Sequence, residues 1–262
     1  MGATELKRVP TILPKDAPAV KEKFSQRRRL HGLSILHEDD AVIVAVKDAG
    51  LLTEATRKHD SFTAENALNL YLRKGQARSR RHIWLVHRLD RDTSGVMVFA
   101  KTEEACEFLK ERWHEAVLKK YLAVTAGVPS PPAGVLRGWL REDSDLFVRQ
   151  LPFAAVHGER DARAQGLKYA ETKYETLRCK NGRALVLATL HTGRRNQIRV
   201  QFADAGWPIL GDTKYGDGRG KGTGARRLML HALSISFPHP ATGERMEFRA
   251  PPPGEFGMPS NP

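Results

Sequence analysis

Short apolar runs separated by polar segments make up most of the chain between residues 33 and 250. The run AVIVAV at 41–46 is continuous and rich in β-branched residues, which is typical of a buried strand. The segment DAG at 48–50 follows it and predicts a turn. The same pattern predicts further buried strands at 96–100, 121–127 and 184–190.

Two other segments carry apolar residues at the spacing of one helix face. Thr102 is placed to cap a helix that runs to about Val117, with Glu103 and Glu104 in its first turn. A second helix is expected to begin near Asn196 and to end before Gly206. Because strands outnumber helices and their spacing is irregular, the pattern predicts an α+β fold rather than a doubly wound parallel sheet. The inward faces are expected to hold Ala105, Phe108, Leu109, Trp113, Ala116 and Val117 in the first helix, and Ile198, Phe202 and Ala205 in the second.

Length and composition fit one globular domain of catalytic size. The chain has 262 residues, of which 40% are hydrophobic and 28% charged, enough to bury a sizeable core. We expect a basic, polar arm at 1–32, a catalytic domain at 33–250, and a tail at 251–262. The tail is so rich in proline and glycine that we expect no regular packing there.

Neither a membrane span nor a secretion signal is evident. No apolar run approaches the length that crosses a bilayer, and the N-terminus lacks the apolar core of a signal peptide. We therefore expect a cytoplasmic protein that does not bind membranes. Cys106 and Cys179 are far apart and have no partner at zinc-ligand spacing, so each is expected to be a small core residue.

The net charge of +13 indicates a polyanionic partner. Basic residues gather at 21–32, 73–82 and 214–227, and none of these segments has the long apolar face of a membrane-surface helix. Nucleic acid therefore fits better than a lipid surface. A basic surface that is merely solvated is the alternative.

The stretch HRLDRDTSG at 87–95 lies in a short connection between two apolar segments, where loops often carry chemistry. Local spacing alone allows a structural interpretation, because Asp, Thr and Ser side chains commonly bond to backbone N–H groups in turns. A kinase interpretation fails, since the stretch reads H-R-L-D and no D-F-G follows. A phosphate-loop interpretation of 218–224 fails as well, since Lys221 is followed by glycine.

A set of segments in a fixed order resolves the question. HRLDRDTSG resembles the active-site motif of the RluA-type pseudouridine synthases, and LHTGRRNQIRVQFADAGWPILGDTKYG at 190–216 resembles their T-G-R-x-H-Q-I-R and P-I-x-G-D region. Three further segments agree: VIVAVKDAG at 42–50, KKYLAVTAG at 119–127 and the closing strand at 228–244. Together they cover about residues 36–250. The resemblance implies the pseudouridine synthase fold, with a mixed, mostly antiparallel central sheet and flanking helices.

The resemblance also implies roles for four residues. Asp90 would be the catalytic aspartate, and Arg199 the cation that keeps it ionised in a dry site. Tyr121 would stack on the target uracil, and Arg88 would enter the RNA where that base has left. Lys214, Arg219, Arg226 and Arg227 are expected to hold phosphates, which position RNA without reading its sequence. From spacing alone, core packing for the tyrosine and a salt bridge for Arg88 are the simpler interpretations.

The implied activity is an RNA isomerase acting on ribosomal or transfer RNA. The reaction needs a nucleophile but no redox change, so we expect no cofactor, and no metal because the histidines lie in separate motifs. Too few residues precede the first strand for an extra S4-type RNA-binding domain, so the chain resembles the free-standing forms, and we expect a monomer. A catalytically inactive RNA-binding protein of the same fold is the alternative. The sequence departs from the family pattern at Asp48, Asn196 and Gln201. None of these departures affects the aspartate, the tyrosine or the arginine of the motifs.

Overall fold

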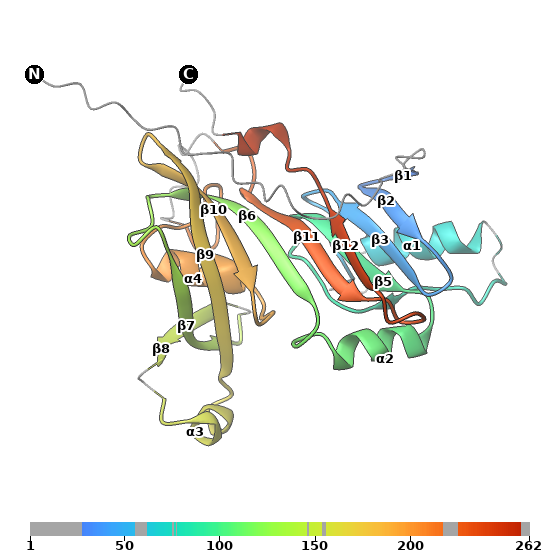
Figure 1. The fold of residues 1–262 in the computed structure, drawn as a ribbon, viewed down its shortest axis with the longest axis horizontal. Helices are drawn as coiled ribbons and strands as arrows, with labels where there is room; N and C mark the ends of the chain where they lie inside the picture. Colours follow the sequence, from blue (N-terminus) through green and yellow to red (C-terminus); the bar gives the residue numbers. More distant parts are fainter. Residues whose placement is uncertain are drawn as a thin grey trace, which may run out of the picture.

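The computed structural model describes residues 28–55, 62–74, 76, 78–145, 147–153, 156–216 and 225–257. In these residues the chain forms a single curved sheet with helices on both faces (Figure 1). The helices are α1 (Ala64–Arg73), α2 (Glu103–Glu111), α3 (Glu159–Ala164) and α4 (Gln197–Asp204), followed by a 3-10 turn, η2 (Gly254–Phe256). The strands are β1 (Arg29–Leu30), β2 (Leu33–Glu38), β3 (Val42–Lys47), β4 (Trp84–Leu85), β5 (Ser94–Ala100), β6 (Leu118–Ala126), β7 (Ala133–Glu142), β8 (Val148–Pro152), β9 (Lys168–Lys180), β10 (Arg183–Leu190), β11 (Leu230–Pro238) and β12 (Arg245–Arg249).

The sheet confirms the expected α+β class with a mixed, mostly antiparallel sheet. Its strand order is β1-β2-β3-β5-β11-β6-β10-β9-β7-β8, with β12 paired to β11 and β4 paired to β5. Among the strands of the described residues, the pair β5–β11 is parallel and all other pairs are antiparallel. The parallel pair brings the segment after residue 94 beside the segment after residue 230, at the middle of the sheet.

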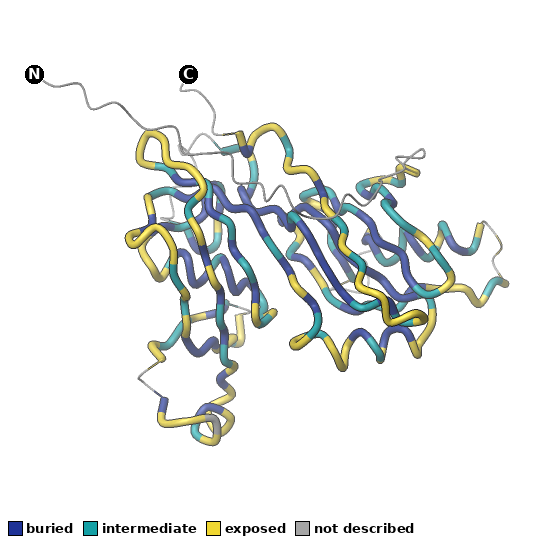
Figure 2. The backbone as a smooth tube through the Cα atoms, viewed as in Figure 1, coloured by how far each residue is buried: buried dark blue, intermediate teal, exposed yellow. Residues whose placement is uncertain are grey.

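Alternation along the central strands divides the core into two layers. In β3, Ile43 and Ala45 face one cluster while Val42 and Val44 face the other, as the two-residue period of a strand requires. Helices α1 and α4 pack on the first face and α2 packs on the second. Figure 2 shows the central strands as the most deeply buried part of the backbone. Strand β5 is buried along its whole length, which explains its continuous apolar sequence.

The four expected strands are present as β3, β5, β6 and β10, and the turn after the first lies at residues 49–50. The hydroxyl of Thr102 caps α2 by accepting a hydrogen bond from the Ala105 amide at 3.1 Å, as expected. That helix ends at Glu111, however, and not near Val117. Val117 is nevertheless buried in the same cluster, because the chain after the helix still passes over that face of the sheet.

Three other expectations about burial are wrong in part. Ala205 follows the end of α4 and is exposed, although Ile198 and Phe202 are buried as expected. Cys106 is buried, but Cys179 is exposed near the end of β9, where that strand extends toward a solvent-facing turn. The tail also packs in part, since Phe256 is only 2% exposed and joins the main core. No helix in the described parts of the chain is long and apolar enough to cross a membrane.

Two buried polar side chains hold the backbone on either side of Asp90. The hydroxyl of Thr53 donates to the Leu89 carbonyl at 2.8 Å and accepts from the Leu89 amide at 3.2 Å. The Lys47 ammonium is fully buried and donates to the carbonyls of Arg91, Leu51 and Asp48 at 2.7–2.9 Å. Leu89 and Arg91, on either side of Asp90, are therefore both held by the segment 47–53, which comprises the end of β3 and the residues that follow it.

Lys47→Met should destabilise the protein by roughly 2–4 kcal/mol, because three carbonyls lose their buried donor. Urea unfolding at neutral pH measures this change. Lys173→Met, on the exposed side of β9, is the matched control and should leave the midpoint nearly unchanged. Equal midpoints for the two variants would contradict the anchoring role of Lys47.

Candidate active site

The loop that carries Asp90 is a tight turn between β4 and β5. The Thr93 amide donates to the Asp90 carbonyl at 3.1 Å, which closes the turn through backbone atoms. Gly95 has φ of +124°, and a Cβ on it would lie 2.2 Å from the Ala232 carbonyl oxygen of β11. Glycine is therefore required where the parallel strands approach each other. Packing therefore explains the glycine of the motif. It does not explain the aspartate side chain.

The Asp90 carboxylate is paired with an arginine from a distant part of the chain. Its Oδ2 accepts a hydrogen bond from Nη1 of Arg199, in the first turn of α4, at 3.0 Å. The two side chains are 26% and 11% exposed, so the pair is shielded but open to solvent on the side of the aspartate. The structure thus brings together two of the residues that the sequence predicts. The hydrogen bond from Arg199 to Asp90 is therefore not a contact within the turn. It joins two segments that are far apart in the sequence.

A second carboxylate, Asp212, holds the same guanidinium from the other side. Arg199 donates through Nε and Nη2 to the two oxygens of Asp212, both at 2.8 Å. Asp212 also accepts from the amides of Lys214 and Tyr215 at 2.9 and 3.0 Å, and its side chain is 1% exposed. Burial raises the pKa of Asp212, but the bonds from Arg199 and these amides outweigh burial and lower it overall. Burial lowers the pKa of Arg199, and Asp212 and Asp90 together raise it above its usual value.

This bidentate pair fixes the plane of the guanidinium, so that the remaining nitrogen, Nη1, is aimed at Asp90. Asp212 lies within the quoted G-D region, but the sequence pattern predicts no role for it. A buried aspartate and an arginine 13 residues apart have no local periodicity that would link them. The only sequence signal was an acidic residue beside a glycine in a segment that is otherwise apolar.

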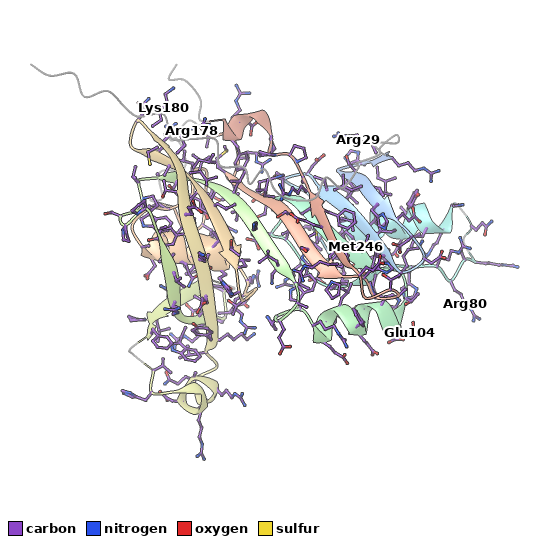
Figure 3. The ribbon with its side chains drawn as sticks, viewed as in Figure 1. Arg29, Arg80, Glu104, Arg178, Lys180 and Met246 are labelled. Atoms are coloured by element: carbon purple, nitrogen blue, oxygen red, sulfur yellow. The ribbon has the colours of Figure 1, made fainter. Side chains whose placement is uncertain are left out.

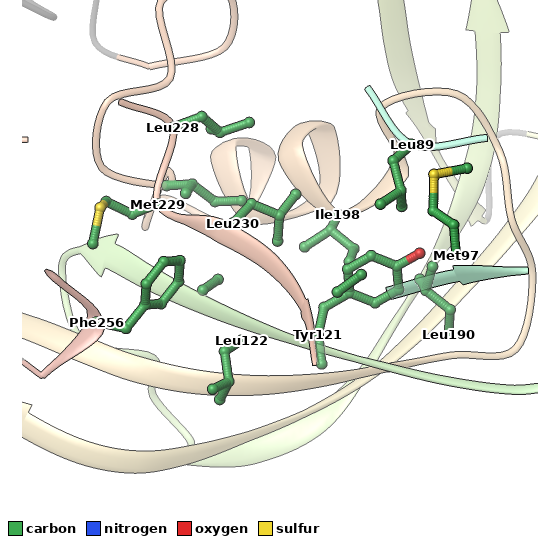
Figure 4. Close-up of a cluster of buried hydrophobic side chains, with 14 of the residues drawn as sticks. Leu89, Met97, Tyr121, Leu122, Leu190, Ile198, Leu228, Met229, Leu230 and Phe256 are labelled. Atoms are coloured by element: carbon green, nitrogen blue, oxygen red, sulfur yellow. The ribbon is translucent and has the colours of Figure 1, made fainter. Parts of the chain in front are cut away.

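Tyr121 is the third predicted residue that the structure brings to this place. It lies on β6, is 8% exposed, and packs among Leu89, Leu190 and Ile198 (Figure 4). Burial and the negative charge of Asp90 raise the pKa of its hydroxyl, so the phenol stays neutral at physiological pH. A neutral phenol offers a flat apolar face and one O–H donor. Tyr121 is therefore buried in the core, as the simpler interpretation predicts. It also lines a pocket.

A pocket joins these side chains and opens between the Asp90 loop and α4. Its walls combine the polar groups of the predicted residues with aliphatic side chains such as Leu230, and with three further polar residues for which no role was predicted: Thr93, Arg194 and Gln197. Apolar walls with converging polar groups are a common feature of ligand sites. The pocket is lined by Arg88, Leu89, Asp90, Thr93, Tyr121, Leu190, Arg194, Asn196, Gln197, Ile198, Arg199 and Leu230.

Arg88 lies at the mouth of this pocket. Its side chain is 55% exposed and forms an ion pair with Glu54 at 2.8 Å. An exposed pair of this kind contributes little to stability and is readily exchanged for another partner. Both interpretations of this residue from the sequence are therefore compatible with its position, since the salt bridge is present and the guanidinium borders the pocket.

The basic residues expected to hold phosphates are not equivalent. Arg226 is exposed, and the Lys214 ammonium lies over the rings of Phe147 and Tyr215 at 5.1 and 5.5 Å. Arg227 instead donates to Ser94 Oγ at 2.6 Å and to the Leu230 carbonyl at 3.4 Å, so its contacts are internal and structural. The expectation of a phosphate contact is not favoured for that residue. Arg219 lies outside the described residues.

The departures from the family pattern have different positions. Asn196 adopts φ of +54°, a conformation that asparagine tolerates, and its Oδ1 accepts from Nη1 of Arg199 at 3.1 Å. It therefore contacts the arginine directly. Gln201 is fully buried and accepts from the Thr172 hydroxyl at 2.6 Å, while Asp48 pairs with Arg29 at the surface. Within the described residues, His, Cys, Asp and Glu form no group of three that could hold a metal ion.

Comparison with known proteins gives consistent relatives. The family described as RNA pseudouridylate synthase matches residues 41–204. Ribosomal large subunit pseudouridine synthase C of Haemophilus ducreyi is 34% identical over 94% of this chain and 74% of its own length. The protein of the same name from Salmonella typhimurium is 36% identical over 83% of this chain and 66% of its own length. The tRNA pseudouridine synthase C of Haemophilus influenzae is 32% identical over 83% of this chain and 92% of its length.

Solved structures agree with this result. Human RNA pseudouridylate synthase domain containing 4 superposes with a TM-score of 0.66 and 26% identity, over 85% of this chain and 90% of that one. Human RNA pseudouridylate synthase domain containing 1 shares the fold with a TM-score of 0.64 at 23% identity, over 84% and 83% of the two chains. The sequence match, the fold and the pocket around Asp90 lead to one conclusion: this chain belongs to the RNA pseudouridylate synthase family.

Proposed function

We propose that this chain isomerises uridines of ribosomal or transfer RNA to pseudouridine, with Asp90 as the catalytic nucleophile. The observation that carries the proposal is the Asp90 carboxylate, bonded to Arg199 at 3.0 Å in a pocket that Tyr121 also lines. The names of the relatives support the substrate class, because they include enzymes of large-subunit ribosomal RNA and of transfer RNA.

The reaction requires only groups that this pocket contains. The N1–C1′ bond of the uridine breaks, the uracil turns, and a C5–C1′ bond forms; C5 then loses a proton and N1 gains one. Electrons and atoms balance without an oxidant, a reductant or an energy source. A carboxylate contributes by attacking the sugar or the ring, or by stabilising a glycal path, and all three routes begin from the ionised form of Asp90.

The surrounding residues suit the other demands of this chemistry. Arg199 is held by Asp212, so it stabilises a charged Asp90 without moving during the reaction. The neutral Tyr121 offers a flat face to the extruded base, and stacking on an aromatic ring recovers about 1–3 kcal/mol of the unstacking cost. Arg88, at the pocket mouth, is placed to fill the space that the base leaves in the RNA.

The outer surface supports an RNA partner. Arg178 and Lys180 project near the β9–β10 turn, while Arg29 and Arg80 project at the opposite end of the molecule (Figure 3). Together with Lys214 and Arg226 they offer phosphate contacts over a long span. Action as a monomer is part of this proposal. The cytoplasm is the location we propose, since transfer and ribosomal RNA are encountered there.

Asp90→Asn should lower the release of hydrogen from C5 of labelled uridine in RNA by at least about a thousandfold, because the variant lacks the nucleophilic carboxylate. Asp92→Asn is the matched control, since Asp92 is two residues away and forms an exposed pair with Arg91. It should retain activity. Unchanged release by the Asp90 variant, or no release by the unmodified protein under any condition, would remove the catalytic proposal and favour the inactive RNA-binding alternative.

Asp212→Asn should lower kcat more than it raises KM. Asp212 holds the Arg199 guanidinium that positions Asp90, but Asp212 itself does not contact the substrate. The substitution should also cost about 3 kcal/mol of stability, the usual effect of breaking a buried pair. The pKa of Asp212 is lowered in the folded protein, so this stabilisation is present above the unfolded value of about 3.9 and is lost as the pH falls further.

Activity assays and urea unfolding at pH 7 and at pH 3 test both effects of Asp212→Asn. The pH dependence of stability in the acid range should be weaker in the variant than in the unmodified protein. Asp143→Asn, which breaks an exposed pair with Arg149, should change neither kcat nor stability appreciably. A fall in stability with unchanged kcat would show that Asp212 has no positioning role.

The substrate within the proposed class is decided by mapping pseudouridines in the cellular RNA of strains with and without the gene. The expected result is the loss of one or a few sites in ribosomal or transfer RNA, restored by the unmodified gene and not by the Asp90→Asn gene. An unchanged map would contradict the proposed substrate class.

A further inference from the structure

A second cleft, of about 360 Å³, adjoins the Asp90 pocket on the other side of Tyr121. The two cavities share Arg88, Tyr121, Leu190 and Arg194 as walls. The far side of the cleft is formed by the chain after α2 and the start of β6, including Trp113 and Lys119. The cleft therefore lies next to the place that a target uridine would occupy in the Asp90 pocket.

The Lys119 side chain is the unusual feature of the cleft. The residue is 4% exposed, and its ammonium, itself buried, has no hydrogen-bond partner. The ammonium lies over the Trp113 ring, whose centroid is 5.2 Å from Nζ. A buried cation without an acceptor is costly, and folded proteins usually avoid this arrangement or provide a carboxylate.

The charges around the cleft do not compensate this ammonium. Arg194 and His114 also line it, and the one carboxylate among the lining residues is Glu54, which is already paired with Arg88. Burial and Arg194 lower the pKa of Lys119 to about 8, and burial, Arg194 and Lys119 lower the pKa of His114. Burial is the first cause of both shifts, and the neighbouring positive groups add to it.

Gly193 leaves space beside the buried ammonium. A Cβ at this position would lie 3.7 Å from Lys119 Nζ and 3.9 Å from Trp113 Nε1. A larger side chain would fill the space in front of both groups. The missing side chain, the unpartnered ammonium and the adjoining guanidinium therefore point to an anionic ligand that enters between them.

We propose that this cleft binds a backbone phosphate of the RNA strand next to the target uridine, with Lys119 and Arg194 as its ligands. The inference rests on the proposed function for the identity of the strand. A phosphodiester carries the single negative charge that the cleft lacks, and it is linked to the ribose that must lie beside Asp90. An ion pair formed in this shielded place would be stronger than one on the open surface.

The test measures RNA binding in the Asp90→Asn chain, so that it does not depend on turnover. Lys119→Met should weaken the binding of a structured substrate RNA about tenfold and reduce the slope of log affinity against log salt by about 0.7–0.9, the value for one phosphate contact. Lys120→Met is the matched control, because the adjacent side chain points to the opposite side of β6. It should leave the slope unchanged.

Thermal unfolding separates this binding role from a structural one. Removing an unpartnered buried charge should leave the Tm of Lys119→Met equal to or higher than that of its parent, whereas the loss of a structural contact would lower it. Gly193→Val, which keeps the charge and fills the cleft, should also weaken RNA binding. Unchanged affinity and salt slope in Lys119→Met would overturn the proposal, whatever the outcome for the activity of the unmodified protein.

A free anion as the ligand is distinguished in the same experiments. Inorganic phosphate, exchanged for chloride at constant ionic strength, should raise the Tm of the parent no more than that of Lys119→Met if the site requires the RNA strand. A phosphate effect confined to the parent, together with an unchanged RNA slope in the variant, would overturn the assignment to RNA.

Discussion

The arrangement of the site depends on one guanidinium shared between two unequal carboxylates. Asp212 is buried and accepts from two backbone amides as well as twice from Arg199, so both of its oxygens are held by donors of the protein. Asp90 receives a single bond from the same group and faces an open pocket. The difference in donors, and not a difference in residue type, makes one carboxylate a structural anchor and leaves the other available for chemistry.

The sheet makes this pairing possible across 109 residues of sequence. The parallel pair β5–β11 places the Asp90 loop in the middle of the sheet, and β6, which carries Tyr121, is the next strand beyond β11. Helix α4 packs on the same face and presents Arg199 from its first turn. Lys47 and Thr53 hold the backbone of the Asp90 loop by hydrogen bonds. Both partners of the ion pair, Asp90 and Arg199, are therefore held by rigid parts of the fold.

The sequence predicted those features that depend on local pattern or on the order of motifs. Strand β3 follows from its apolar run, and Asp90, Tyr121 and Arg199 follow from the motifs, and the structure does bring these three together. Helix α1 was not predicted, although its buried residues Ala64, Leu68 and Leu72 recur at the four-residue spacing of a helix face. Asp212 and the internal bonds of Arg227 were missed because they depend on contacts between distant segments, for which a single sequence gives no signal.

The two adjoining cavities differ in charge in the way that the parts of a nucleotide differ. In the Asp90 pocket the arginine is already neutralised by two carboxylates, which suits a neutral uracil and its ribose. In the Lys119 cleft the Lys119 ammonium has no hydrogen-bond partner, and an anion would supply one. Every nucleotide of a polynucleotide carries a neutral base and an anionic phosphate. A polynucleotide is therefore the ligand that matches the charges of this pair of cavities. A free base would satisfy the first cavity alone, and a free anion the second.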